Sequence, residues 1–392
     1  MEQGKQISAP FGFIDYRARR EYLLMALAAL LFSVSHNYSA LLAIVFERSG
    51  HSIQATGLLL SLFAVTAIAG SLLSSAIAAQ LGILRSVRWA IFLTCIGMGS
   101  FAFTRDSFAL ALASRLVQGV GVGMLVPVAL VYIQSRLTRE NAVVLLTSFT
   151  AVVPLAAAIA PPLGEWTLKH YGMTALFIEA AAPAAAGLLL TIGLRDAPRP
   201  SNTGGLNLQG AFQPHLYLPY VVMLAGGGLY GYSVNYLAAS MQERAILLAA
   251  FFIPSSFSLI AVRFGAIWFM GRMGPRLLSA LSMMTYGSGY LFIASADGPG
   301  MIIAGALLFG IGNSINFPIV AAWVGEGLDP SRRVAPQAVS NASFYFGMYA
   351  LPWPQSFVIA AYGYTVMEWA WAAIGLTLMV IMWWVVLLRR SG

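Results

Sequence analysis

Long apolar stretches alternate with short polar breaks along most of the 392-residue chain. A helix of about 20 apolar residues is long enough to cross the hydrocarbon core of a bilayer. The pattern predicts twelve membrane-spanning helices, at residues 22–45, 55–80, 86–103, 107–134, 140–164, 172–194, 216–239, 244–270, 277–295, 299–325, 336–360 and 366–388. We therefore expect an all-α integral membrane protein.

One polar break is longer than the others and divides the twelve spans into two sets of six. It covers residues 195–215 and is rich in Pro, Gly and Asn, which is typical of a linker. The expected organisation is a terminal segment at 1–21, a six-helix bundle at 22–194, the linker, and a second six-helix bundle at 216–392.

The composition fits a chain whose main solvent is lipid. Hydrophobic residues make up 59% of the chain and charged residues only 9%, whereas a soluble domain carries roughly 25% charged residues. Cys95 is the single cysteine of the sequence, so an intrachain disulfide is excluded.

The basic residues gather in alternate polar segments. If both termini lie inside, sixteen of the 22 Lys and Arg residues fall in inside segments and four in outside segments. Because positive charge is retained on the cytoplasmic side, this bias predicts a multi-pass protein of a bacterial-type inner membrane with both termini and the linker in the cytoplasm. The net charge of +8 then reflects anionic lipid at the inner face, and no nucleic-acid partner is expected.

The two halves of the chain repeat each other. The stretch QGVGVGMLVPVA at 118–129 lines up with FGIGNSINFPIV at 309–320, at an offset of 191 residues. Further matches at similar offsets are Pro161 with Pro352, Gly82 with Gly274, and the Asn-Tyr pair at 37–38 with the pair at 235–236. An even number of spans separates the copies, so the halves are parallel repeats, as in membrane transporters.

Glycine and proline inside a span have a packing role in lipid. Small residues let helices approach closely, and neighbouring helices can satisfy the carbonyl that a proline frees. We assign this role in the fourth span to Gly119, Gly121, Gly123 and Pro127.

These features together resemble the major facilitator superfamily, most closely its efflux permeases, over essentially the whole chain. That family has twelve spans, pseudo-twofold halves and a fourth-span motif R-x-x-Q-G-x-G, which Arg115, Gln118, Gly119 and Gly121 match. APPLG at 160–164 is similar to the fifth-span motif of the family's exporters, although Ala160 replaces a glycine. The resemblance implies a transporter fold that needs no cofactor and no metal.

The family's cytoplasmic-loop motif, G-x-x-x-D-R-x-G-R, is largely lost. Ala79 and Gly271 stand where the two copies of the motif have an acid. In the family this acid pairs across the cytoplasmic helix ends, so we expect the protein without substrate to rest more often with its cavity open to the cytoplasm. The residues to which the resemblance gives a structural or gating role are Gly82, Pro161, Gly164, Arg263, Arg272 and Gly274.

In this family spans 1, 4, 7 and 10 line the central cavity. Their polar residues, which we predict to line the path of substrate and protons, are His36, Asn37, Arg115, Gln118, Tyr230, Tyr232, Asn235, Tyr236, Asn313 and Asn316. At ~1.5 Å per residue, Arg115 and His36 both lie about 15 Å from the outer ends of their spans, so they can share one layer. A charge at this depth usually faces a cavity or a partner; the alternative is a structural pin that binds exposed carbonyls.

Two groups are candidate proton carriers. His36 can change charge near neutral pH, the alternative being a neutral imidazole held between helices. Glu179 lies seven residues into the sixth span, which the family places at the periphery, so a structural role is the alternative there. The asparagines either bind substrate or join neighbouring helices.

The sequence thus predicts a secondary transporter of a small organic solute that works by alternating access, with proton-coupled export favoured by the fifth-span motif. Import of a vitamin-, nucleoside- or metallophore-like solute is the alternative, and a non-transporting assembly factor is the rival of another class. An enzyme is not expected, because the spans offer one isolated glutamate and no His/Cys cluster. The expected partners of this monomer are the solute, the bilayer and protons.

Overall fold

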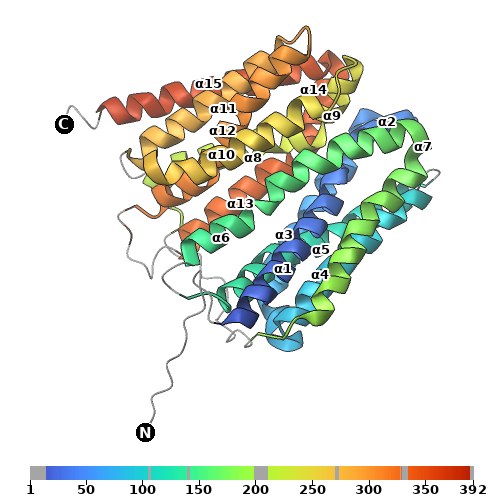
Figure 1. The fold of residues 1–392 in the computed structure, drawn as a ribbon. Coiled ribbons are helices and arrows are strands. Elements are labelled where there is room, and N and C mark those ends of the chain that lie inside the picture. Colours follow the sequence, from blue (N-terminus) through green and yellow to red (C-terminus); the bar gives the residue numbers. More distant parts are fainter. Residues whose placement is uncertain are drawn as a thin grey trace. The chain divides into compact units, whose positions relative to one another are not determined.

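The computed structural model describes residues 15–104, 107–138, 142–197, 211–269, 273–326, 328 and 334–388. Helices follow one another through these ranges (Figure 1). The predicted linker at 195–215 is described only at its two ends, and the predicted gating residue Arg272 lies outside the described residues.

The helices occur in the order of the predicted spans, and most of their ends agree with the prediction within a few residues. The largest differences are the first helix, which begins at Tyr16 rather than 22, and the fifth span, whose helix continues past 164 to the turn at Gly172. The elements of the first half are α1 (Tyr16–Asn37), η1 (Tyr38–Leu41), α2 (Leu42–Arg48), α3 (Ile53–Leu81), α4 (Ile83–Ser100), η2 (Phe101–Phe103), α5 (Phe108–Gln134), α6 (Ala142–Thr150), α7 (Val152–Leu190) and η3 (Thr191–Gly193). Those of the second half are α8 (Pro214–Asn235), α9 (Leu237–Glu243), α10 (Ala249–Phe269), α11 (Pro275–Ala294), α12 (Pro299–Val324), α13 (Val334–Ala350), α14 (Pro352–Tyr362) and α15 (Tyr364–Leu388).

The described helices are consistent with twelve passes. Within the ranges given above, eight helical segments are long and apolar enough to cross a membrane. One of them contains Gly172, whose φ of 81° is not helical, and this turn lies where the predicted fifth and sixth spans meet. The predicted seventh and eleventh spans are each built from two shorter helices, α8 with α9 and α13 with α14.

The described residues form two compact units. The first unit takes the residues up to His36, together with Val65–Ala156 and the segment from Phe177 to the linker. The second takes Asn37–Ala64, Ala157–Leu176 and everything after the linker. Two pieces of the first half therefore pack with second-half helices. The bundle boundaries at 22–194 and 216–392 stay a prediction, because the units follow contacts and the predicted bundles follow the repeat.

Glycines of α5 are points of close helix approach in the first unit. A Cβ atom on Gly121 would lie 2.5 Å from the carbonyl oxygen of Ala90 in α4, and one on Gly123 would collide with the carbonyl of Ala67 in α3. These contacts agree with the packing role that small residues have in lipid.

The same arrangement recurs around α12 in the second unit. A Cβ atom on Gly310 would collide with the carbonyl of Ser255 in α10, and one on Gly312 would lie 2.9 Å from the carbonyl oxygen of Ser282 in α11. Helices α10 and α11 follow each other in the second half as α3 and α4 do in the first. The sequence repeat is thus also a repeat of helix contacts.

The repeated Asn-Tyr pair marks a break in two equivalent spans. Helix α1 ends at Asn37 and gives way to the turn η1, and α8 ends at Asn235, after which α9 begins. The amide of Asn235 donates to the carbonyl of Gly231 at 2.7 Å, a local bond of the kind that competes with helix continuation. In lipid, irregular backbone is tolerated only where protein buries it or where it lines a cavity.

Candidate functional site

A buried polar cluster lies in the first unit. The guanidinium Nη1 of Arg115 donates to Oε1 of Gln118, one turn along α5, at 2.6 Å. The amide nitrogen of Gln118 contacts His36 Nδ1 at 3.5 Å and also donates to the sulfur of Met98 at 2.8 Å. Arg115 is 1% exposed and Gln118 is fully buried. The structure therefore brings His36 and Arg115 into one layer through Gln118.

The chemistry of this cluster follows from its charge. If the Gln118 amide donates to Nδ1, a neutral His36 carries its proton on Nε2. Arg115 keeps a full positive charge away from water, which is costly unless that charge has a functional or structural use. The cluster can bind an acceptor group of a solute or hold three helices together, and both roles remain predictions.

The two asparagines of α12 make interhelical hydrogen bonds. Tyr286 on α11 donates to Oδ1 of Asn313 at 2.9 Å, and the amide nitrogen of Asn316 donates to Ser282 Oγ at 3.4 Å. Asn316 is fully buried, and its Oδ1 has no hydrogen-bond partner among the described residues. Both asparagines thus join helices, while Asn316 keeps one acceptor for a further group.

Tyr230 and Arg263 lie near each other in the second unit. Tyr230 on α8 stacks on Phe344 of α13, with the ring centroids 6.3 Å apart. Arg263 on α10 is close enough to Tyr230 for the two to interact electrostatically. This places the predicted gating arginine beside a predicted pathway residue, and the gating role stays a prediction.

The remaining pathway candidates of the seventh span lie at or next to the point where its helix is interrupted. Tyr232, Asn235 and Tyr236 are at most 2% exposed. The hydroxyl of Tyr236 donates to the carbonyl of Pro352 at 2.9 Å, and Asn235 donates to the carbonyl of Met348 at 3.3 Å. Hydrogen bonds to the eleventh span therefore stabilise the interruption of the seventh span.

A fully buried carboxylate inside a predicted span, Glu368, was missed by the sequence reasoning. Glu368 on α15 is fully buried, accepts from Ser240 Oγ at 2.6 Å and from the hydroxyl of Tyr232 at 3.3 Å, and forms an ion pair with Arg244. The expectation of a single isolated glutamate in the spans was wrong. The available signal is an acid just inside the twelfth predicted span, Glu368, and a base at the start of the eighth, Arg244.

Glu179, the second candidate proton carrier, lies on α7, and the described contacts of its neighbours in the chain are with other helices. Glu179 is half-buried on α7. Two residues before it, Phe177 packs on Phe101 with ring centroids 5.1 Å apart, and two residues after it, the carbonyl of Ala181 accepts a weak hydrogen bond from Cys95. The role of Glu179 as a proton carrier stays a prediction.

Pro161 and Gly164 of the fifth span are both buried in the second unit. A Cβ atom on Gly164 would lie 2.9 Å from the ring of Tyr38 in η1. The glycine thus allows the fifth span to approach the break in the first span.

Further contacts join first-half and second-half segments inside the second unit. Ser61 Oγ on α3 donates to the carbonyl of Ala350 at 3.1 Å and accepts from the backbone nitrogen of Trp353 at 2.8 Å. The hydroxyl of Tyr364 donates to Glu47. Glu47 and Tyr364 lie at span ends that the charge pattern places outside, whereas Ser61 and Ala350 lie six and ten residues inside their predicted spans.

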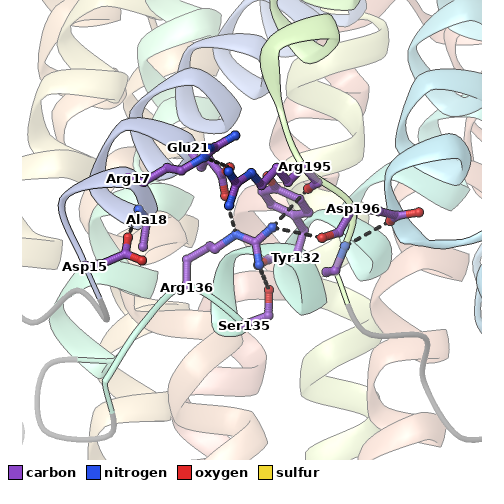
Figure 2. Close-up of polar contacts among 10 residues, drawn as sticks. Asp15, Arg17, Ala18, Glu21, Tyr132, Ser135, Arg136, Arg195 and Asp196 are labelled. Atoms are coloured by element: carbon purple, nitrogen blue, oxygen red, sulfur yellow. Dashed lines mark hydrogen bonds and ion pairs between the residues drawn. The ribbon is translucent and has the colours of Figure 1, made fainter.

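At the opposite ends of the spans in the first unit, Arg136 organises a second polar network (Figure 2). Its guanidinium forms an ion pair with Glu21 at 2.7 Å and donates to the carbonyls of Arg195 and Asp196 at 2.9 and 3.2 Å. The Arg136 guanidinium also lies 4.7 Å from the centre of the Tyr132 ring. This network ties α1 to α5 and to the chain that follows η3.

Asp196 also supports the turn at Gly82. Its Oδ1 accepts from the backbone nitrogen of Leu84 at 3.0 Å, in the first turn of α4. Gly82 has a φ of 93°, and a Cβ atom there would lie 2.6 Å from Oδ2 of Asp196, so glycine is needed. Its repeat partner Gly274 has a φ of −65° and open space around it, so that glycine has no such requirement.

Comparison with known proteins agrees with this architecture. The family model of the Major Facilitator Superfamily matches residues 22–352. Among solved structures, the chain is similar to a D-xylose-proton symporter, with 14% identity, a TM-score of 0.74, and 92% of this chain and 96% of that chain covered. It is also similar to the nucleoside transporter NupG, with 14% identity, a TM-score of 0.76 and coverage of 92% and 98%. It is similar as well to the human organic anion transporter MFSD10, with 17% identity and a TM-score of 0.68. That match covers 94% of this chain and 100% of the other.

Proposed function

The chain belongs to the Major Facilitator Superfamily, and on this basis we propose that it moves a small organic solute across a bacterial-type inner membrane by alternating access. The superfamily consists of transporters, and the solved structures similar to this chain are those of transporters rather than enzymes. In this proposal the chain acts as a monomer, and both termini lie in the cytoplasm, as the distribution of basic residues predicts.

The observation that carries this proposal is the cluster of Arg115, Gln118 and His36. A fully desolvated arginine beside an amide and an imidazole offers donors to a polar or anionic group, and a hydrogen bond to a charged group contributes about 1.5–3 kcal/mol. Two interrupted spans, at Asn37 and Asn235, supply irregular backbone inside the membrane, which transporters use at substrate sites.

The test is solute flux into proteoliposomes. A thermal-stability screen with sugars, nucleosides and organic anions, which are the solutes in the titles of the similar structures, selects the solute to be measured. Arg115→Ala should then fold but lose about tenfold or more of the flux, because one charge-assisted hydrogen bond is removed. Arg276→Ala is the matched control, since the side chain of that arginine is 25% exposed and pairs with Glu326 at 2.6 Å. Undiminished flux in Arg115→Ala would reduce Arg115 to a packing residue.

Proton-coupled export is the direction that we favour. Support comes from the APPLG stretch at 160–164, whose Gly164 packs against the break in the first span. A proton on His36 would place a second positive charge in the layer of Arg115, so binding of an anionic solute there would favour protonation of His36. Solute and proton would then move in the same direction, which supports import rather than export. Import remains the alternative direction, and a D-xylose-proton symporter is among the similar structures.

We further propose that the resting protein is closed at its outer side. The contacts of Ser61 with the eleventh span and of Glu47 with Tyr364 support this state. The missing acids of the loop motif at Ala79 and Gly271 favour it as well, because they leave fewer contacts to hold the cytoplasmic side shut.

A further inference from the structure

A groove of about 300 Å³ lies on the surface of the first unit. Arg85, Arg88, Trp89 and Phe92 of α4 line it together with Leu188 of α7. Trp89 is 50% exposed and Phe92 is 39% exposed, so both aromatic rings face outward from the bundle. We call this surface the α4–α7 groove.

The four α4 residues form one stripe along the helix. They are spaced at i, i+3, i+4 and i+7, which places them on a single face. From Arg85 to Phe92 the helix rises about 10 Å. The stripe therefore passes from two cations near the end of the span, through a tryptophan, to an aromatic ring deeper in the membrane. Tryptophan is typical of the boundary between headgroups and hydrocarbon.

The two arginines are placed to bind an anion. Arg88 donates from Nη2 to the carbonyl of Thr191 at 2.8 Å and from Nε to its hydroxyl at 3.3 Å, which fixes the guanidinium and leaves Nη1 available. Arg85 is exposed. Among the described residues neither arginine is in an ion pair. The groove thus has two cations at one end and an apolar wall below them.

We propose that the α4–α7 groove binds one anionic phospholipid. The arginines hold its phosphate, and Trp89, Phe92 and Leu188 hold the first part of an acyl chain. Charge complementarity selects an anionic lipid, since each basic side chain near such a surface contributes about 1 kcal/mol. With the orientation proposed above, the lipid belongs to the cytoplasmic leaflet; binding itself does not depend on that orientation or on transport.

The test uses the purified full-length protein in detergent. Native mass spectrometry measures the binding of phosphatidylglycerol and of phosphatidylcholine with identical acyl chains. Phosphatidylglycerol should bind more tightly, and Arg85→Gln should weaken it about fivefold, which corresponds to ~1 kcal/mol. Arg85→Lys should keep most of the affinity, and Arg276→Gln, which removes a cation already paired with Glu326, should leave it unchanged.

Two further measurements separate the phosphate from the chain. Phe92→Ala should weaken the binding of phosphatidylglycerol. Glycerol phosphate, which has no acyl chains, should not compete with phosphatidylglycerol at equal concentration. If Arg88→Gln fails to fold because its contacts with Thr191 are lost, Arg85→Gln and Phe92→Ala still decide the matter. Equal binding of the two lipids, or unchanged binding in Arg85→Gln, would overturn the proposal. Full competition by glycerol phosphate would replace a lipid site with a simple anion site.

Discussion

Glu368→Gln should destabilise the protein far more than the loss of an exposed ion pair does. The carboxylate is fully buried, accepts from Ser240 and Tyr232, and pairs with Arg244, whose side chain is 18% exposed. Removing one partner of a buried pair costs about 3–5 kcal/mol, because the other charge stays behind without compensation. Since Arg244 has some access to water, we expect a cost near the lower end, about 3 kcal/mol.

The matched control is Glu326→Gln. Glu326 and Arg276 also form an ion pair, at 2.6 Å, but their side chains are 43% and 25% exposed. Exposed pairs of this kind contribute about 0–1 kcal/mol. The two variants remove the same chemical group, so the difference between them measures the effect of burial. The assay is the midpoint of thermal unfolding of each purified variant in the same detergent.

A double variant tests the pairing itself. If Glu368 and Arg244 act as one unit, Arg244→Gln with Glu368→Gln should cost clearly less than the sum of the single changes. The reasoning is refuted if Glu368→Gln unfolds at the same temperature as Glu326→Gln. Strict additivity of the two single changes would instead show that Glu368 acts through its hydroxyl donors rather than through Arg244.

Three other predictions concern topology, protons and the gate. Tags at both termini should be accessible only from the cytoplasm and a tag in 48–52 only from outside, and protection of that tag from outside reagents would reverse the orientation. His36→Gln should flatten the pH dependence of flux if His36 carries the proton, whereas an unchanged profile would assign the proton to another group. Ala79→Asp should shift spin-label distances toward the state open to the outside, and a population that does not move would show that other contacts hold the inner gate.

The sequence predicts the helices of this protein well because lipid imposes a minimum length on each apolar segment. It predicts the repeat equally well, since Gly121 and Gly312 have to be small for equivalent helix pairs to touch. It is harder to predict which side of each helix faces the protein interior and which side faces lipid. Spans that are apolar on nearly every side carry little periodicity, so Gln118 and Tyr232 were equal candidates. The structure places Gln118 beside His36 and Arg115, and Tyr232 beside Glu368.

The loop motif shows why a lost residue cannot be judged by position alone. Asp196 reaches α4 from the end of the sixth span and accepts from Leu84, so an acid stands near Gly82 although Ala79 is neutral. Its Oδ1 also accepts from the backbone nitrogen of Ala197, and its own carbonyl accepts from Arg136. These contacts of Asp196 stabilise the first unit internally. Ala79→Asp would add a second acid three residues before Gly82, at the position where the family's acid pairs across the cytoplasmic helix ends, and the expectation for this variant rests on that position.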